Sequence, residues 1–259
     1  HFLEYILIRI LILGVTPLSQ KQVVTIGRCL GALVFCFSRK RKKAAFTNME
    51  IMFSDSYTSD QKMRVIKNSF KTLAVSAVQS VWVTINTEER VRKLIEGNPK
   101  GLNILKKCLE KKNGIFFLTA HYGNWEIMGL YHGLIGVCPL SSIVRKLDNP
   151  YLDTFVTKLR TTTSNQVFYR DDSLLKIVRE LKNNSSVAVM MDQNTAKGGL
   201  FVEFFGLQAS TPRAVAQLSY RIGTPVLPLF CYPTDKGTYK IEYGPELILE
   251  KSENKDQDI

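Results

Sequence analysis

Short apolar runs alternate with helical patterns over most of the chain. Each run is short enough for a buried strand and is bounded by Gly, Pro or polar residues. The runs cover residues 114–120, 141–145, 166–169, 187–191, 226–231 and 239–243. Apolar positions at helical spacing recur near residues 101–112, 124–134, 150–161, 173–182 and 211–222. This alternation predicts an α/β fold with a mainly parallel central sheet flanked by helices.

Two apolar stretches dominate the beginning of the chain, at residues 2–18 and 23–37. Charged residues interrupt both of them, Glu4 and Arg9 in the first and Arg28 in the second. A helix of about 15 residues spans roughly 22 Å, which is short for a hydrocarbon core of about 30 Å. We therefore expect an N-terminal apolar helical membrane-anchoring segment, either an embedded hairpin or one helix completed by upstream residues. The sequence GRCLG at 27–31 is interpreted as close helix packing.

Five consecutive cations at residues 39–43 follow these stretches. Such a run beside an apolar helix is attracted to anionic headgroups, at about 1 kcal/mol per residue. A solvated loop or a nucleic-acid patch is the alternative, but the adjacent apolar segments favour an anionic membrane surface. We therefore assign residues 1–43 to a membrane-associated part and residues 44–259 to a second domain, which includes a long amphipathic helix near 59–85. Because the chain starts without Met and ends in mid-pattern, we expect a fragment truncated at its C-terminal end.

Composition narrows the classes of protein. The chain is 45% hydrophobic and 22% charged, as expected of a globular protein, and its net charge of +12 favours anionic partners. Five scattered cysteines without a C-x-x-C pair suit reduced, packed thiols. With three histidines and no close Cys or His partner for His121 or His132, a metal site is not expected. Glycine-rich nucleotide motifs and a G-x-S-x-G elbow are absent from the sequence, so we expect no cofactor.

Polar residues follow several of the predicted strands directly. His121 follows the first run, Arg145 ends the second, Arg170 follows the third, and Asp192 with Gln193 follows the fourth. In a parallel sheet ligands collect at the carboxyl ends of the strands. This places a base, two cations and a carboxylate on one rim, although each could also be an ordinary polar residue leaving a buried strand.

His121 and Glu126 are five residues apart, a spacing at which they cannot meet on one continuous helix. They can meet across a turn if His121 ends a strand, Gly123 makes the bend and Asn124 caps the next helix. A neutral imidazole there could accept a proton from a hydroxyl, with Glu126 orienting the ring. The alternative is a buried histidine held by a backbone carbonyl.

The residues resemble the lipid A biosynthesis acyltransferases, a branch of the lysophospholipid and glycerol-phosphate acyltransferase superfamily that shares an H-x-x-x-x-E motif. The resemblance extends from the apolar N-terminal segments to about Tyr243. It is carried by ordered blocks: 120–126 (AHYGNWE), 144–150 (VRKLDNP) with Arg160, Asp192-Gln193, 204–206 (FFG) with Thr211, and 223–228 (GTPVLP). No P-E-Q-W-like segment follows Tyr243, which agrees with truncation.

The resemblance implies an enzyme on the cytoplasmic face of the inner membrane. It would transfer an acyl chain from acyl carrier protein, or from acyl-CoA, to a hydroxyl of a membrane lipid acceptor, a lipid A precursor or related phospho- or glycolipid. His121 and Glu126 would be catalytic. The substrate-binding residues would be Arg145, Arg160, Asp192 and Asn124, the two arginines holding phosphate or phosphopantetheine.

Two other classes of protein compete with this interpretation. A non-catalytic peripheral membrane protein that binds anionic lipid would account for the apolar and basic segments, but not for the convergence of His121, Glu126 and Asp192. A nucleic-acid binder is favoured by charge alone, and the apolar beginning of the chain without an aromatic and basic stripe disfavours it. We therefore expect no nucleic-acid partner.

Overall fold

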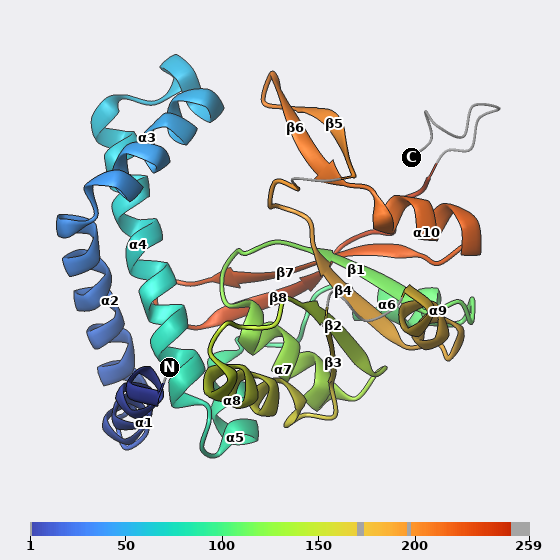
Figure 1. Cartoon of the computed structure of the whole chain (residues 1–259), viewed down its shortest axis with the longest axis horizontal. Helices are drawn as coiled ribbons and strands as arrows, with labels where there is room; N and C mark the ends of the chain where they lie inside the picture. Colours follow the sequence, from blue (N-terminus) through green and yellow to red (C-terminus); the bar gives the residue numbers. More distant parts are fainter. Residues whose placement is uncertain (1, 170–173, 196–197, 250–259) are drawn as a thin grey trace.

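A central sheet organises the computed structural model, which describes residues 2–169, 174–195 and 198–249 (Figure 1). Its six strands lie in the order β3-β2-β4-β1-β7-β8. All neighbouring pairs are parallel except β7 with β8, so the predicted mainly parallel sheet is confirmed. The strands are β1 (Ile115–Thr119), β2 (Leu140–Val144), β3 (Gln166–Tyr169), β4 (Ser186–Met190), β7 (Val226–Pro233) and β8 (Tyr239–Tyr243).

Helices cover both faces of this sheet (Figure 1). Successive side chains of β1 point to opposite faces, and Phe117 packs in one hydrophobic cluster while Phe116 packs in another. The Phe117 cluster includes residues of α4 to α7, and the Phe116 cluster includes residues of α9 and α10. The helices are α5 (Thr87–Leu94), α6 (Leu102–Leu109), α7 (Trp125–Ile135), α8 (Pro150–Thr161), α9 (Leu174–Lys182) and α10 (Ala214–Ile222).

The N-terminal third forms a helical arm beside the sheet (Figure 1). It comprises α1 (Phe2–Val15), α2 (Gln20–Phe37), α3 (Arg39–Phe53), the short η1 (Ser54–Ser56) and α4 (Ser59–Trp82). α2 lies along α4, and a Cβ built on Gly27 would come within 2.6 Å of the Val75 Cα, so the predicted close packing is confirmed. The run of cations is not a loop, since Arg39 begins α3.

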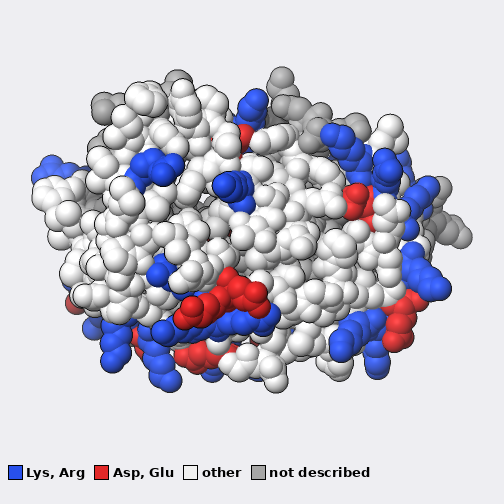
Figure 2. Space-filling model, turned by 90° about the horizontal axis from the view of Figure 1, so that it is seen from below, with Lys and Arg blue, Asp and Glu red and all other residues white. Residues whose placement is uncertain are grey.

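The lengths and apolar character of the helices in the arm can be compared with those of a membrane span. Among the described residues, no single helix has both the length and the apolar character needed to cross a bilayer. The pair 20–37 and 39–56, bent by 91°, meets those criteria of length and composition when taken together. Figure 2 shows the side of the molecule that faces downward in Figure 1, where uncharged side chains predominate and charged ones lie along the edges, in a band across the lower half and at a few places in the middle.

A two-stranded hairpin departs from the sequence prediction. β5 (Gly199–Phe204) and β6 (Leu207–Pro212) pair antiparallel, separate from the central sheet. The helix expected from residue 211 begins at Ala214 instead, because Thr211 and Pro212 pair with β5. The apolar residues of β5 do not alternate regularly with polar ones, so the period-two signal of a strand is weak there.

Candidate active site

The turn after β1 places the candidate catalytic residues. Gly123 has a φ of +64°, and a Cβ on it would overlap the carbonyl oxygen of Cys231 on β7, so only glycine fits. Asn124 then caps α7, its Oδ1 accepting a hydrogen bond from the Ile127 N–H at 3.2 Å. The predicted strand, turn and capped helix are therefore confirmed.

Asp192 is the carboxylate that contacts His121. The Nδ1 atom of His121 lies 2.9 Å from Oδ1 of Asp192, and the backbone N–H of His121 donates to Oδ2 at 2.9 Å. Both side chains are 36% exposed, so the pair lies at the surface of the site. Asp192 follows β4, which neighbours β1 in the sheet, and this adjacency brings together residues 71 positions apart.

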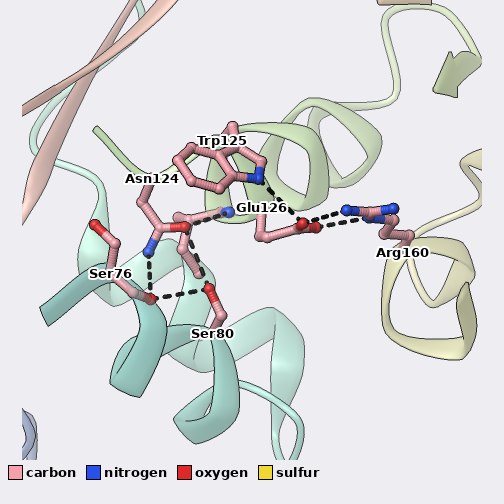
Figure 3. Close-up of polar contacts among 7 residues, drawn as sticks. Ser76, Ser80, Asn124, Trp125, Glu126 and Arg160 are labelled. Atoms are coloured by element: carbon pink, nitrogen blue, oxygen red, sulfur yellow. Dashed lines mark hydrogen bonds and ion pairs between the residues drawn. The ribbon is translucent and has the colours of Figure 1, made fainter. Parts of the chain in front are cut away.

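Glu126 does not contact His121 in this structure, and its catalytic role stays a prediction. Its carboxylate pairs with the guanidinium of Arg160 on α8, with 2.9 Å between Arg160 Nε and Glu126 Oε2, and accepts a hydrogen bond from Trp125 Nε1 at 3.2 Å (Figure 3). The carboxylate that orients the imidazole is thus that of Asp192. Glu126 is connected to His121 through Trp125, whose ring packs edge-on against the imidazole with 5.1 Å between the ring centroids.

The ion pair of Glu126 and Arg160 is largely withdrawn from water. The side chains are 17% and 26% exposed. Burial acts to lower the pKa of Arg160, but the hydrogen bonds and charge of Glu126 outweigh it and the pKa is raised. Arg160 was expected to hold a phosphate, whereas here its charge is matched by Glu126.

A buried polar network fixes the turn to the helical arm. Asn124 is 1% exposed, and its Nδ2 donates to the Ser76 carbonyl at 3.2 Å (Figure 3). The same nitrogen donates to the Tyr239 hydroxyl at 3.4 Å. Ser76 in turn donates to the Gly123 carbonyl at 3.0 Å, and Gln79 accepts from Tyr239. Asn124 was expected to bind substrate; its polar atoms are engaged here by the protein. Ser76 and Gln79 were not predicted from the sequence, because helical spacing alone gives no signal for buried polar partners.

An apolar groove lies beside this turn. Its volume is about 340 Å³, and Asn124, Trp125 and Glu126 form part of its wall. Most of the wall is aliphatic or aromatic and comes from α1, α4, α8 and the loop before α8: Ile8, Leu11, Leu73, Ala77, Val81, Leu147, Leu152, Phe155, Val156 and Leu159. Such a groove suits a hydrocarbon chain.

The remaining predicted cations are less constrained. Arg145 follows β2, is 76% exposed and pairs with Asp148 at 2.9 Å. Arg170 lies outside the described residues. Within the described ranges, His, Cys, Asp and Glu side chains form no group of three that could hold a metal ion.

The fold is an α/β fold with a mainly parallel central sheet, and comparison with known proteins identifies it as that of an acyltransferase family. A family model described as bacterial lipid A biosynthesis acyltransferase matches residues 2–258. The chain is 25% identical over 226 residues to the lipid A biosynthesis palmitoleoyltransferase of Escherichia coli (strain K12), covering 86% of this chain and 72% of that protein. The lipid A biosynthesis acyltransferase of Shigella flexneri matches with the same identity and coverage. The chain belongs to the bacterial lipid A biosynthesis acyltransferase family.

Proposed function

We propose that this protein transfers a fatty acyl group from a thioester donor to a hydroxyl of a lipid A precursor or a related phosphorylated glycolipid. The observation that carries the proposal is the 2.9 Å contact between His121 Nδ1 and Asp192 Oδ1 beside an apolar groove. The family and its relatives in lipid A biosynthesis support the acceptor class. Acyl carrier protein is the expected donor, with acyl-CoA as the alternative.

The reaction follows from the tautomer of His121. Since a carboxylate only accepts hydrogen bonds, Nδ1 carries the proton and Nε2 keeps a free lone pair. Nε2 removes the proton of the acceptor hydroxyl while the oxygen attacks the thioester carbonyl carbon. The C–S bond then breaks, and the leaving thiolate takes the proton from the imidazolium. Asp192 stabilises the imidazolium between these two steps.

Glu126 acts as a positioning residue in this mechanism. The hydrogen bond that Glu126 accepts from Trp125 holds the indole edge-on to His121. The ion pair of Glu126 with Arg160 neutralises the guanidinium charge beside the groove. The acyl chain occupies the groove, because its apolar wall offers few polar partners. Arg145, whose side chain is 76% exposed and pairs with the exposed Asp148, binds an anionic group of donor or acceptor.

Membrane association is part of the proposal. Apolar side chains on the outer faces of α1 and α2 are exposed, including Ile10, Leu13, Leu33 and Phe37, and the cations of 39–43 follow directly. This combination favours an anionic leaflet, the cytoplasmic face of the inner membrane. A non-catalytic lipid-binding protein would share this surface but would not need the pairing of His121 with Asp192.

The test supplies the purified chain with a labelled acyl–acyl-carrier-protein thioester, or separately with labelled acyl-CoA, and a lipid A precursor in detergent micelles. Mass spectrometry is expected to detect the acceptor with one added acyl chain. His121→Ala should form this product at least about a hundredfold more slowly. Glu110→Gln, which changes an exposed carboxylate at the C-terminal end of α6, should retain the parent rate. Full activity in folded His121→Ala would contradict the mechanism. Lipid binding without transfer from either donor would favour the non-catalytic alternative.

A further inference from the structure

A small cavity lies where the helical arm meets the turn between β7 and β8. Its volume is about 50 Å³, and two cations stand on its wall, Arg28 of α2 and Lys71 of α4. The rest of the wall comes from α4 and from the turn: Thr72, Val75, Pro233, Thr234, Gly237 and Tyr239. At about 10–15 Å³ for each water-sized group, the cavity has room for about four such groups, which is the number of oxygens in a phosphate.

Close packing of the two helices brings the cations together. α2 and α4 lie side by side (Figure 1), and a Cβ on Gly31 would come within 2.5 Å of the Lys71 Cα. Arg28 follows Gly27, on which a Cβ would come within 2.6 Å of the Val75 Cα. The two glycines leave no side chain between the helix backbones here. Two like charges are therefore held at one cavity.

Neither cation is neutralised by the protein. Nη2 of Arg28 donates to the backbone carbonyl of Asp235 at 2.5 Å, a partner without a full charge. In the part of the chain that the structure describes, neither Arg28 nor Lys71 forms an ion pair. Glu96 accepts a hydrogen bond from Thr234 of the wall at 3.4 Å but does not itself line the cavity. Because Lys71 is half-buried and its charge is unmatched, an anion in the cavity would be attracted to both cations.

The turn that closes the cavity is fastened to the arm. Nε2 of Gln79 on α4 donates to the Gly237 carbonyl at 2.6 Å. Gly237 has a φ of +75°, and a Cβ on it would come within 2.5 Å of the Val24 side chain on α2. A ligand therefore does not have to order the turn, which lowers the entropic cost of binding.

The cavity and the apolar groove lie on opposite sides of α4. Lys71 and Val75 line the cavity, whereas Leu73 and Ala77 line the groove. At about 100° of rotation per residue, each pair lies on one face of the helix and the two pairs point in nearly opposite directions. A ligand in the cavity and an acyl chain in the groove can therefore be bound at the same time.

The cavity also adjoins the turn that carries the candidate catalytic histidine. Tyr239 of its wall accepts the hydrogen bond from Asn124 at 3.4 Å. The Cδ atom of Pro233, also of the wall, lies 3.6 Å from the position of a Cβ on Gly123. One layer of side chains thus separates a ligand in the cavity from the turn that follows His121.

We propose that this cavity binds a phosphate group of a lipid, held by Arg28 and Lys71. The guanidinium offers N–H donors in a fixed plane and the ammonium offers three more, so both can contact one phosphate. This inference rests on the proposed function, in which the acceptor is a phosphorylated glycolipid, and assigns a position to one of its phosphates. The headgroup of an anionic phospholipid has the same chemistry, and the experiments below distinguish the two sources.

The first test measures binding without acyl transfer. Acetylation of Lys71 by limiting acetic anhydride is followed by mass spectrometry in neutral detergent micelles, with no acyl donor present. The micelles contain a phosphorylated lipid A precursor, the same precursor without its phosphates, or phosphatidylglycerol. We expect at least about fivefold slower acetylation of Lys71 with the phosphorylated precursor or with phosphatidylglycerol, whichever is the source, and no slowing with the dephosphorylated precursor.

Lys107, exposed on α6 and outside the cavity wall, is the internal control and should keep its rate with every lipid. An unchanged rate for Lys71 with both phosphate-containing lipids would overturn the proposal, as would equal slowing by the precursor without phosphates. Either result is independent of whether the protein transfers acyl groups, so a failure of this site is distinguishable from a failure of the proposed function.

The second test asks what the bound phosphate does. If it belongs to the acceptor, Lys71→Gln should raise KM for the phosphorylated acceptor about tenfold with kcat within about twofold, because a charge-assisted hydrogen bond is lost. KM for the dephosphorylated acceptor should not change, and Lys71→Arg should restore most of the affinity. If the phosphate belongs to phosphatidylglycerol, Lys71→Gln should instead weaken partition into vesicles of that lipid and leave KM unchanged.

Lys67→Gln is the matched control, because it removes an exposed lysine one turn earlier on the same helix, outside the cavity wall. It should leave KM and partition at the parent values. A rise in KM that is equal for both acceptors would indicate a structural role for Lys71 and overturn the proposal. No change in either KM or partition would overturn it as well.

Discussion

His121 and His132 belong to the same turn-helix segment but occupy opposite environments. His121 is 36% exposed and its Nδ1 faces the carboxylate of Asp192. His132 is 1% exposed; its Nδ1 lies 2.8 Å from the Tyr243 hydroxyl and its Nε2 lies 3.1 Å from the Cys138 carbonyl. A carbonyl can only accept, so His132 carries its proton on Nε2 and accepts at Nδ1 from the tyrosine.

The two histidines differ in how many of their ring nitrogens are engaged by the protein, and we propose that only His121 takes part in proton transfer. In His132 both ring nitrogens are already engaged by protein groups, and burial lowers its pKa to about 4, so it stays neutral and inert. In His121 one nitrogen is fixed by a carboxylate and the ring is open to solvent, which leaves the other nitrogen available for proton transfer. Residue type and local sequence do not distinguish the two; the partners and the exposure do.

The largest expected effect is that replacing His121 lowers activity and not stability, whereas replacing His132 lowers stability. His121→Ala should lower kcat/KM for acyl transfer by about 10²–10⁴-fold, the range for a general base, and change the free energy of unfolding by less than about 0.5 kcal/mol. His132→Ala should destabilise the fold by about 2–4 kcal/mol, because it leaves a cavity and two unpaired polar groups. Steady-state kinetics and urea unfolding measure both. A large stability loss in His121→Ala would show that the comparison is wrong.

The next effect is the pH dependence of stability due to His132. Its pKa is about 4 in the folded state against 6.5 for an unperturbed histidine, so on acidification the unfolded chain binds the proton first. The free energy of unfolding should fall by about 3 kcal/mol between pH 6.5 and pH 4, and this contribution should then level off. His132→Phe removes the contribution of His132 protonation to stability and leaves the carboxylates of the protein unchanged. The stability difference between parent and variant should shrink over this range in urea titrations; a constant difference would refute the assignment.

A smaller effect is expected for the carboxylate of Asp192. Asp192→Asn offers an amide that can donate to Nδ1 and favours the wrong tautomer of His121, so kcat should fall on the order of 10²-fold. The effect is below that of losing the base, because the partly exposed carboxylate is screened by water. The pH profile of kcat should also shift, since the charge that stabilises the imidazolium is gone. Glu110→Gln, at an exposed carboxylate that follows α6, is the control.

The smallest effect tests which carboxylate serves His121. Glu126→Gln should lower kcat by only about tenfold, because Glu126 acts on the imidazole through Trp125. It should also destabilise the fold by about 1–2 kcal/mol, since Arg160 loses a partner in a mostly buried ion pair. A loss of activity equal to that of His121→Ala would instead show that Glu126 acts directly on substrate or ring.

The elements of the sheet were predictable because their signals are local. The bounds of α8 and β3 match the periodic pattern, and Asn124 was identified as a cap from its place before α7. The β5–β6 hairpin was not predicted, because its exposed aromatic residues do not follow the alternation of apolar and polar positions that burial imposes on a strand. In the site, the rim with His121 and Asp192 was predicted from strand ends, but the pairing of His121 with Glu126 was wrong, since proximity in sequence does not fix which side chains face each other.

The sequence by itself determined the alternation of strands and helices, the turn at Gly123 and the position of His121 at a strand end, because these depend on periodicity, backbone conformation and capping within a few residues. Tertiary structure decided the partners: Asp192 for His121, Arg160 for Glu126 and Ser76 for Asn124. It also formed the apolar groove from α1, α4, α7 and α8. These contacts join residues that are 34 to 71 positions apart, and only strand order and helix packing bring such residues together.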